Sequence, residues 1–259
     1  MLVDDDKLVL SSLRRVLDSI PLCRTETFLD SLAAAEYLKS NEADLLVADY
    51  VMPGLDGLGL IEQVRLRHPD MAVLLISGVA TLEMMQSACR LGTTDVLFKP
   101  ISAQALLDSV HWALEKRNAA IQRSSLVAFA RHAMDILSTS PAASPEAVRP
   151  PIFPREGSLE MDLASNQLTF NGRTLELSGY EYLIMEILMR RQGQLVTHNE
   201  IRRHITGAEE PKNVASDLVR GHIARLRRKI EKDPSRPRLL RSVWGKGYIL
   251  SLEFDSEAS

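Results

Sequence analysis

The sequence predicts two folded domains of different class: a doubly wound parallel α/β domain over residues 1–118 and an α+β domain over residues 156–255. Three observations predict this. The length of 259 residues suits two domains of ordinary size. Apolar, strand-like runs alternate with helix-period segments in the first part. A stretch with five prolines, inside the segment 119–155, separates that part from short strands and helices with turn signals.

The first domain is predicted from continuous apolar runs, which are typical of parallel strands covered on both faces. The clearest runs are residues 45–48, 73–76 and 96–98, and helical segments at 59–67 and 82–91 lie between them. A long helical pattern then starts near Ser102 and runs to about Leu137, which exceeds what one domain-closing helix needs. Only Met1, Leu2 and Val3 precede the first acids, so the sequence leaves open whether the true start lies upstream.

The second domain begins with strand-like pieces at residues 159–162 and 167–170, followed by a turn at Asn171-Gly172. The helix pattern recurs at residues 179–191, 198–204 and 215–231. The end is predicted to form a hairpin from residues 239–243 and 248–252. No internal repeat interrupts this order.

The net charge of −3 hides an asymmetry between the two domains. Residues 1–118 sum to −6, whereas residues 213–246 contain ten basic and three acidic residues. An acidic first domain and a locally basic second one favour a cation site in the former and a polyanion partner for the latter.

The two cysteines, Cys23 and Cys89, stand in apolar surroundings and are predicted to be reduced core thiols. The longest strongly apolar run, near residues 72–80, is too short to span a bilayer. Acids follow the first three residues, unlike the start of a signal peptide. A cytoplasmic protein without a membrane partner is the expectation.

Four chemically distinctive elements converge at the carboxyl edge of the predicted parallel sheet. Asp4 and Asp5 follow the first strand, and Asp49, Ser77 and Lys99 end later ones. Three packed carboxylates repel one another unless a divalent cation lies among them, and oxygen ligands suit Mg²⁺. A metal-bound carboxylate beside a lysine can accept a phosphoryl group, with Lys99 clamping it and Ser77 donating a hydrogen bond.

These residues resemble the receiver domain of bacterial two-component response regulators, which is CheY-like with a flavodoxin-like fold. The resemblance rests on Asp4-Asp5, on the segment from Asp49 to Gly57 with its Met-Pro-Gly and Asp-Gly pairs, on Ser77-Gly78 and on Lys99-Pro100. It implies that a sensor histidine kinase phosphorylates Asp49. It also implies that Asp5, Asp49 and the backbone carbonyl of Val51 hold Mg²⁺, supported by Asp4.

Three positions depart from the pattern that this resemblance implies. Val96 stands where the family usually has Tyr or Phe, which normally swings inward on phosphorylation. Ala105 and Ser109 stand where OmpR/PhoB receivers usually carry the Glu and Arg of their dimer face. We therefore expect any phospho-dependent homodimer to use the long helix beyond residue 120 instead. A helix that folds back on its own receiver is the alternative.

The segment 215–231 combines cations with an apolar stripe, which fits either a groove-binding helix or a solvated amphipathic helix. The wider pattern resembles the OmpR/PhoB winged-helix effector domain over about residues 157–253. It rests on residues 177–183, 193–197, 222–230 and 243–248. The resemblance implies a winged helix-turn-helix fold, a recognition helix at 215–231, a wing at 244–248 and a loop at 206–213 that can face RNA polymerase.

The expected contacts with double-stranded DNA divide by position. Phosphate contacts are expected from Arg225, Arg227, Arg228 and Lys246, whereas Asp217 and Arg220 lie near the helix start and suit base edges. His222 is as consistent with a core or backbone-contacting role as with base reading.

The sequence thus predicts a DNA-binding transcriptional regulator that is switched by phosphorylation and is not an enzyme. An aspartate-based phosphotransferase or phosphatase is an alternative, but such enzymes often carry a second Asp where this chain has Val51. The other alternative is a phosphorylation-independent adaptor, which Val96 favours.

Overall fold

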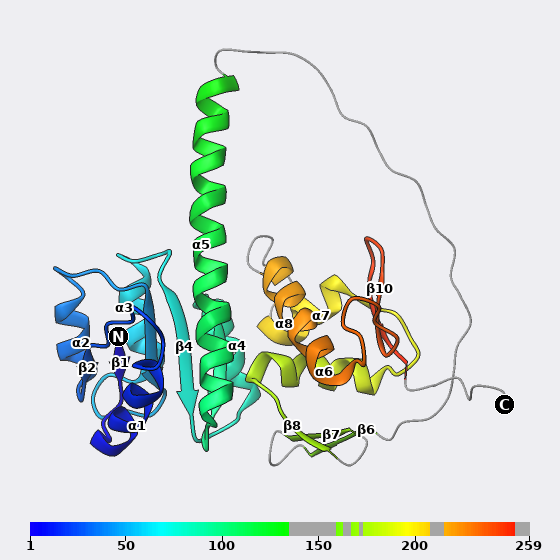
Figure 1. The fold of residues 1–259 in the computed structure, drawn as a ribbon, viewed down its shortest axis with the longest axis horizontal. Helices are drawn as coiled ribbons and strands as arrows, with labels where there is room; N and C mark the ends of the chain where they lie inside the picture. The colour runs from blue at the N-terminus through cyan, green and yellow to red at the C-terminus, as the bar shows by residue number, and fades with distance from the viewer. Residues whose placement is uncertain (135–158, 163–166, 171–172, 208–214, 252–259) are drawn as a thin grey trace.

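A computed structural model describes residues 1–134, 159–162, 167–170, 173–207 and 215–251. Two folded units, one α/β and one α+β, lie side by side, and one long helix extends between them (Figure 1). Within these ranges, no helix is both long and apolar enough to cross a membrane.

The first unit is the predicted parallel sheet, with the strand order β2-β1-β3-β4-β5. Strands β3 (Leu45–Asp49) and β4 (Ala72–Ser77) lie at its centre, and every residue of both is buried. Strand β5 (Asp95–Phe98) forms one edge. The continuous apolar runs of the sequence are therefore strands covered on both faces. Strands β1 (Leu2–Val3) and β2 (Thr27–Phe28) complete the sheet.

Helices cover both faces of this sheet. Helices α1 (Lys7–Leu17) and α5 (Ala103–Met134) pack on one face, where Leu10, Leu13 and Leu106 belong to one apolar cluster. Helices α2 (Ser31–Tyr37), α3 (Gly57–Arg65) and α4 (Leu82–Arg90) contribute to the cluster on the other face. Helices α1 and α2 and strand β2 were not predicted from the sequence.

Each helix of this layer except α5 starts at a side chain that accepts hydrogen bonds from its first turn. These N-caps are Asp6, Asp30, Asp56 and Thr81. The caps satisfy backbone N–H groups that have no partner within the helix. They fix the helix starts beside the carboxyl ends of the strands, where the candidate site lies.

The second unit has an antiparallel sheet of β6 (Leu159–Asp162), β7 (Gln167–Phe170) and β8 (Arg173–Glu176). Helices α6 (Gly179–Arg190), α7 (His198–Thr206) and α8 (Ala215–Ile230) follow. A small sheet with the order β10-β11-β9 closes the unit; its strands are β9 (Val196–Thr197), β10 (Leu240–Val243) and β11 (Gly247–Leu250).

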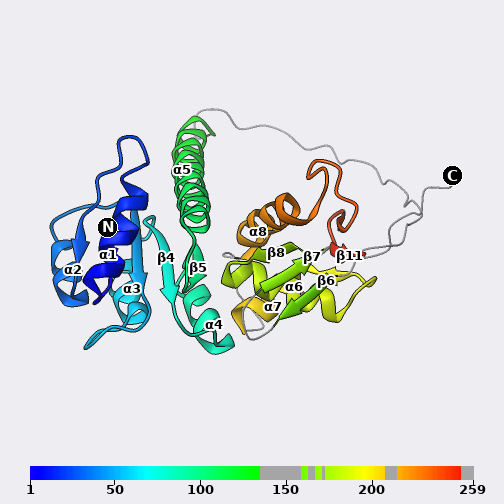
Figure 2. The same cartoon turned by 60° about the horizontal axis from the view of Figure 1, so that its bottom comes forward.

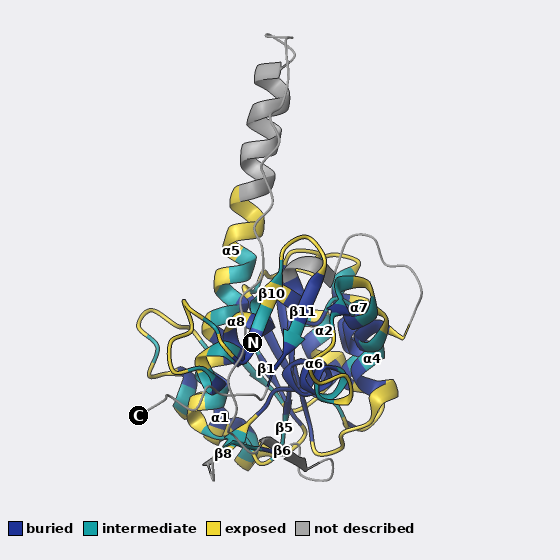
Figure 3. Ribbon diagram, turned by 90° about the vertical axis from the view of Figure 1, so that its right-hand side faces the viewer, coloured by how far each residue is buried: buried dark blue, intermediate teal, exposed yellow. Residues whose placement is uncertain are grey.

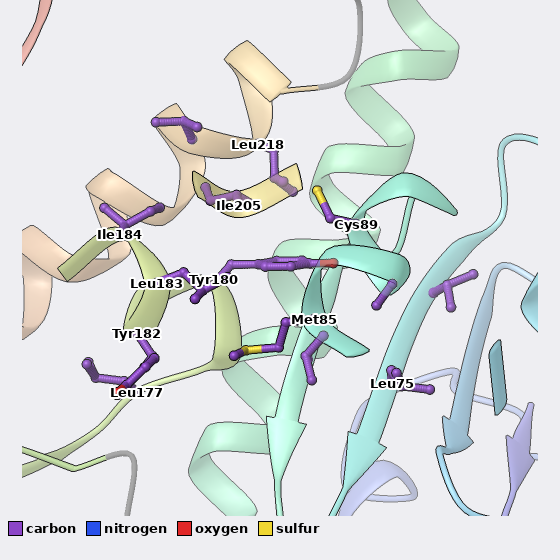
Figure 4. Packing of buried hydrophobic residues seen from close by; sticks show 14 of the residues in the cluster. Leu75, Met85, Cys89, Leu177, Tyr180, Tyr182, Leu183, Ile184, Ile205 and Leu218 are labelled. Atoms are coloured by element: carbon purple, nitrogen blue, oxygen red, sulfur yellow. The ribbon is translucent and has the colours of Figure 1, made fainter. Parts of the chain in front are cut away.

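The units share one continuous apolar cluster. Helix α4 packs on α7, and the edge strand β5 packs on α6; Figure 2 shows β5 and α4 facing the second unit. In Figure 4, Tyr180 extends from α6 toward Cys89 on α4, with Met85 beside it. All three side chains are buried, so the two units bury a common core.

Helix α5 continues past the sheet that it covers. Ala113 is buried, whereas Ile121 is exposed, and Figure 3 shows the change from buried to exposed along the helix. The predicted long helix is therefore present as far as Met134, and the predicted residues 135–137 lie outside the described ranges. The prediction for the cysteines was half wrong: Cys89 is buried, but Cys23 is exposed in the loop between α1 and β2.

Candidate functional site

The carboxyl edge of the parallel sheet brings three of the predicted side chains into one ionic cluster. The Lys99 Nζ lies 2.5 Å from Asp49 Oδ1 and 3.0 Å from Asp4 Oδ2. Asp4 follows β1, Asp49 ends β3 and Lys99 follows β5, so strands far apart in sequence deliver them to one point. Lys99 precedes a cis peptide bond to Pro100.

Burial and pairing set the protonation of this cluster. Burial raises the pKa of the Asp49 carboxyl above its ordinary value, although its hydrogen bond and charge interaction with Lys99 oppose the rise. Desolvation would lower the pKa of Lys99, but hydrogen bonds to Asp49 and Asp4 outweigh it and the pKa is raised. Lys99 therefore stays an ammonium, and its single positive charge offsets part of the negative charge of the cluster.

The backbone around Asp49 is held closely. Val51 N–H donates to Asp49 Oδ2 at 3.0 Å. A Cβ on Gly57 would lie 2.2 Å from the Asp49 carbonyl oxygen, so only glycine allows α3 to start this near the strand end. The Asp49 carboxylate is thus fixed in direction, with Oδ1 turned to Lys99.

Two predicted residues lie beside the cluster without joining it. Asp5 is exposed. Ser77 is buried, and its hydroxyl donates to the Val79 carbonyl at 2.7 Å while accepting from the Val79 N–H at 3.0 Å. The Ser77 hydroxyl is therefore engaged with its own loop, not with Asp49.

The donor set at this edge is made of oxygen atoms, which is the chemistry that Mg²⁺ prefers. Asp4 and Asp49 already share one cation, the Lys99 ammonium. Within the described residues, however, no three His, Cys, Asp or Glu side chains are grouped closely enough to hold a metal ion. The chemistry of these donors suits Mg²⁺, but Asp5 is exposed and does not join Asp4 and Asp49.

The predicted DNA-binding residues divide into exposed and engaged side chains. Arg220 and Arg228 are exposed on α8, and Lys246 is exposed at the turn of the β10–β11 hairpin beside Trp244, which is 82% exposed. Arg227 is half-buried and donates to the Leu240 carbonyl and the Ser242 hydroxyl, each at 2.9 Å. The Asp217 side chain lies outside the described residues.

His222 and Arg225 are not where a DNA contact was expected, since both are buried between the two units. The His222 ring lies between Trp112 of α5 and Tyr180 of α6, with ring centroids 4.5 and 5.4 Å away. Arg225 lies 2.5 Å from Asp95 Oδ2 on β5 and 3.0 Å from Glu181 Oε1 on α6. In this arrangement of the units, neither side chain can reach a duplex.

A buried polar network surrounds Arg225. Its Nη2 donates to the Ser109 hydroxyl at 3.1 Å, and Ser109 donates to Asp95 at 3.0 Å. Lys229 adds a second cation, 2.6 Å from Glu181 Oε2. Burial alone would raise the pKa of Asp95, but the charge of Arg225 and hydrogen bonds from Ser178 and Arg225 lower it. Asp95 and Arg225 therefore form a charged pair, and each ion is stabilised by the other.

This interdomain contact is what the sequence reasoning missed. Its residues lie in segments that were predicted from the sequence to be a core helix or a DNA-binding helix. The sequence did contain a signal for this contact: Val96, Ala105 and Ser109 depart from the residues usual in the family. Val96 and Ser109 line the contact.

Acidification should weaken the folded protein through His222. Burial lowers the pKa of His222 to about 4, from an ordinary 6.5. Below pH 6.5 the unfolded chain therefore binds a proton that the folded chain refuses until about pH 4, so stability falls across this window. Between pH 7.5 and pH 5 the expected loss is about 2 kcal/mol. The pKa of Asp95 is lowered, so its contribution fades only below about pH 4.

The measurement is urea unfolding at both pH values for the native protein and for His222→Phe. The phenyl ring keeps the contacts with Trp112 and Tyr180 but cannot bind a proton. The charged groups that act on His222 are present in both proteins: Asp95, Arg225, Glu181 and Lys116. An equal pH-dependent loss in the two proteins would assign the effect to those groups rather than to His222.

Two known protein families match this chain, one over each of the two structural units. Residues 1–111 match the response regulator receiver domain, and residues 172–250 match the C-terminal domain of transcriptional regulatory proteins. The chain is 26% identical to the probable transcriptional regulator ycf27 of Guillardia theta, covering 96% of this chain and 89% of that protein. It is 27% identical to the response regulator MprA of Mycobacterium avium (strain 104), covering 96% of each.

A crystal structure of the response regulator DrrB, an OmpR/PhoB homologue from Thermotoga maritima, aligns over 96% of this chain and 97% of DrrB. The identity is 23% and the TM-score 0.37. The predicted fold classes are confirmed by the parallel receiver sheet and by the two family matches. The protein belongs to the two-component response regulators, as a receiver domain joined to an OmpR/PhoB-type winged-helix DNA-binding domain, and acts as a transcriptional regulator.

Proposed function

We propose that Asp49 is the phosphoacceptor and that its phosphorylation by a sensor histidine kinase controls DNA binding by the winged-helix domain. The observation that carries this proposal is the ionic cluster in which Lys99 lies between Asp49 and Asp4. An ammonium at this place can exchange its carboxylate partner for a phosphoryl oxygen, because both are anionic oxygen ligands.

In the proposed step, an Asp49 carboxylate oxygen attacks the phosphorus of a phosphohistidine on the kinase. The new P–O bond forms as the P–N bond breaks, and the imidazole leaves. Lys99 then pairs with a phosphoryl oxygen, and Ser77 turns from Val79 to donate to another. Asp4, Asp5, Asp49 and the Val51 carbonyl would hold Mg²⁺, which neutralises charge on the transferring oxygens.

The DNA-binding half of the proposal rests on the exposed cations of α8 and the hairpin. Arg228 and Lys246 suit phosphate contacts, and Arg220 lies nearer base edges. Arg227 would add a phosphate contact from its half-buried position. Arg225 and His222 join this set only when the two domains separate. Asp217 remains a proposed base contact outside the described side chains.

The experiment that tests the proposal is uptake of label from acetyl [³²P]phosphate with Mg²⁺, followed by binding of labelled protein to duplex DNA. Uptake that raises DNA affinity is expected. A protein that takes up label but binds DNA unchanged would instead be the phosphorylation-independent adaptor, an alternative that the family matches do not favour.

We also propose that the phosphorylated protein forms a homodimer through the part of α5 that continues beyond its receiver contacts. The exposed Ile121 marks where that part begins. The segment 206–213, which begins at the last residue of α7, is proposed to face RNA polymerase; residues 208–214 lie outside the described ranges.

Deleting residues 120–137 should keep the phosphorylated protein monomeric, because it removes the proposed contact helix; the described side chains within it, at residues 120–122, are exposed. Light scattering on both proteins after phosphorylation gives the mass. An unchanged dimer would place the dimer contact elsewhere, and equal phosphoryl uptake by both proteins serves as the control for receiver folding.

A further inference from the structure

His198, the first residue of α7, lies among the elements that carry the proposed DNA contacts. Its backbone N–H donates to the Lys246 carbonyl at 3.1 Å, which ties the start of α7 to the turn of the β10–β11 hairpin. Its ring packs edge-to-face against Tyr248 of β11, with the ring centroids 5.2 Å apart. Burial raises the pKa of the Tyr248 phenol, so Tyr248 adds no charge at neutral pH. From α8, the charge of Arg220 acts on the His198 ring. His198 therefore lies where α7, α8 and the hairpin meet.

Among the described residues, the charges that act on this imidazole are positive. Burial lowers the pKa of His198 below its ordinary 6.5, and the charges of Arg220 and of Arg202 on α7 itself lower it further. The acid nearest to it along α7, Glu200, forms an ion pair with Arg191 instead. At neutral pH the His198 ring is therefore an uncharged group among cations, and an anionic ligand complements such surroundings.

The receiver donates hydrogen bonds to the opposite end of α7. Gln86 donates to the His204 carbonyl at 3.2 Å, and Arg90 donates to the Thr206 carbonyl at 2.9 Å. His198 lies nearly two helical turns earlier and is partly exposed. A ligand can therefore approach the start of α7 while the two units are in contact.

We propose that His198 is a further contact to a DNA phosphate and takes up a proton when the duplex binds, so that acid strengthens DNA binding. The inference rests on the proposed DNA-binding function. Arg220 on α8 and Lys246 on the hairpin are proposed DNA contacts already, and His198 lies where their two elements meet α7. A protonated imidazole offers two N–H donors and a positive charge, which suits a phosphate oxygen.

Binding and protonation are linked through the pKa of His198. In the free protein this pKa is lowered, because burial and the two arginines disfavour the imidazolium. A phosphate beside the ring favours the imidazolium, so the pKa rises in the complex. In the pH range between these two values, binding draws a proton from solvent onto the unprotonated ring nitrogen. Affinity for DNA therefore rises as the pH falls through this range and levels off below it.

The test measures the affinity of the whole, unphosphorylated chain for a labelled random-sequence 30-base-pair duplex by fluorescence anisotropy at pH 8.0 and pH 6.0. The native protein should bind about fivefold more tightly at pH 6.0. Its affinity should also fall more steeply with salt at pH 6.0, by up to about 0.9 in the logarithmic slope, because one more positive charge meets a phosphate.

Two substitutions fix the charge at this position. His198→Gln keeps a hydrogen-bond donor but cannot become charged. This variant should bind about fivefold more weakly than the native protein at pH 6.0 and show the same affinity and salt slope at both pH values. His198→Arg is charged at every pH. It should bind at pH 8.0 about as tightly as the native protein binds at pH 6.0, without a pH response.

Two other histidines supply the controls. His204 lies on the same helix, but its ring is 2.9 Å from Glu186 Oε2 on α6. His222 is buried between the two units, where its protonation would weaken their contact and uncover α8. Both His204→Gln and His222→Phe should keep the pH response of the native protein. A response that disappears in His222→Phe and persists in His198→Gln would assign it to the contact between the units and overturn the proposal.

Failure of this inference is distinguishable from failure of the proposed function. Native binding that is equally tight at both pH values overturns the role of His198 while leaving DNA binding intact. An equal pH response in the native protein and in His198→Gln does the same. If no form binds the duplex at either pH, even at low salt, the DNA-binding proposal fails and the role of His198 fails with it.

Discussion

Replacing Asp49 with Asn should abolish phosphoryl uptake. The amide keeps the size of the side chain but lacks the anionic oxygen that attacks phosphorus. The fold should tolerate the change, because burial already raises the pKa of Asp49 and Lys99 keeps Asp4 as a partner at 3.0 Å. Incubation with acetyl [³²P]phosphate and Mg²⁺, followed by gel autoradiography, measures the label directly.

Asp6→Asn is the matched control for that experiment. Asp6 stands two residues after Asp4, but its carboxylate caps α1 by accepting from Leu8 N–H at 2.7 Å. Asparagine caps helices about as well as aspartate. The Asp6 variant should therefore take up label like the native protein. Label on the Asp49 variant at the native rate would mean that the phosphoryl group goes to another residue, and the proposed switch would be wrong.

Replacing Arg225 with Ala should open the interdomain contact. The variant leaves Asp95 and Glu181, both fully buried, without their shared cation. Removing one partner of a buried ion pair costs about 3–5 kcal/mol. Most of this cost destabilises the state in which the two domains are in contact, because Asp95 regains contact with water when the domains separate. The radius of gyration should rise, and hydrogen exchange on β5 should accelerate by roughly a hundredfold.

Arg228→Ala provides the comparison, because Arg228 is exposed on the same helix. Replacing Arg228 should leave the radius of gyration and the hydrogen exchange of β5 unchanged. It should change the free energy of unfolding by no more than about 0.5 kcal/mol. Asp95→Asn combined with Arg225→Ala should cost less than the sum of the single changes, since the two groups interact directly. Matching exchange rates in the Arg225 and Arg228 variants would show that the buried pair does not hold the domains together.

The phosphoacceptor cluster could be predicted from the sequence because a topological rule places it. Parallel strands end at one edge, so Asp4, Asp49 and Lys99 had to meet once the strands were assigned. The direction of the Ser77 hydroxyl could not be predicted, because it depends on the local loop and not on strand order. Strands β1, β2 and β9 have two residues each and carry no readable period.

The positions of His222 and Arg225 show a different limit. Periodicity identifies which face of α8 is polar, but it does not say whether water, DNA or another domain covers that face. A basic residue on such a helix therefore looks the same whether it binds a phosphate or Asp95. The information lay in the receiver, where Ser109 leaves room beside Asp95 and Val96 leaves room for α6.

The length of α5 has a consequence for how strongly the two domains need to attract each other. From Ala113 to Met134 the helix carries the chain about 30 Å along its axis, away from the contact at Trp112. The 24 residues from there to Leu159 can reach at most about 80 Å, so the effector is tethered within a small volume around its receiver. A tether of this kind imposes an effective concentration approaching the millimolar range. Even an association too weak to detect between separate molecules would then keep this chain closed, and modest changes at β5 would suffice to release it.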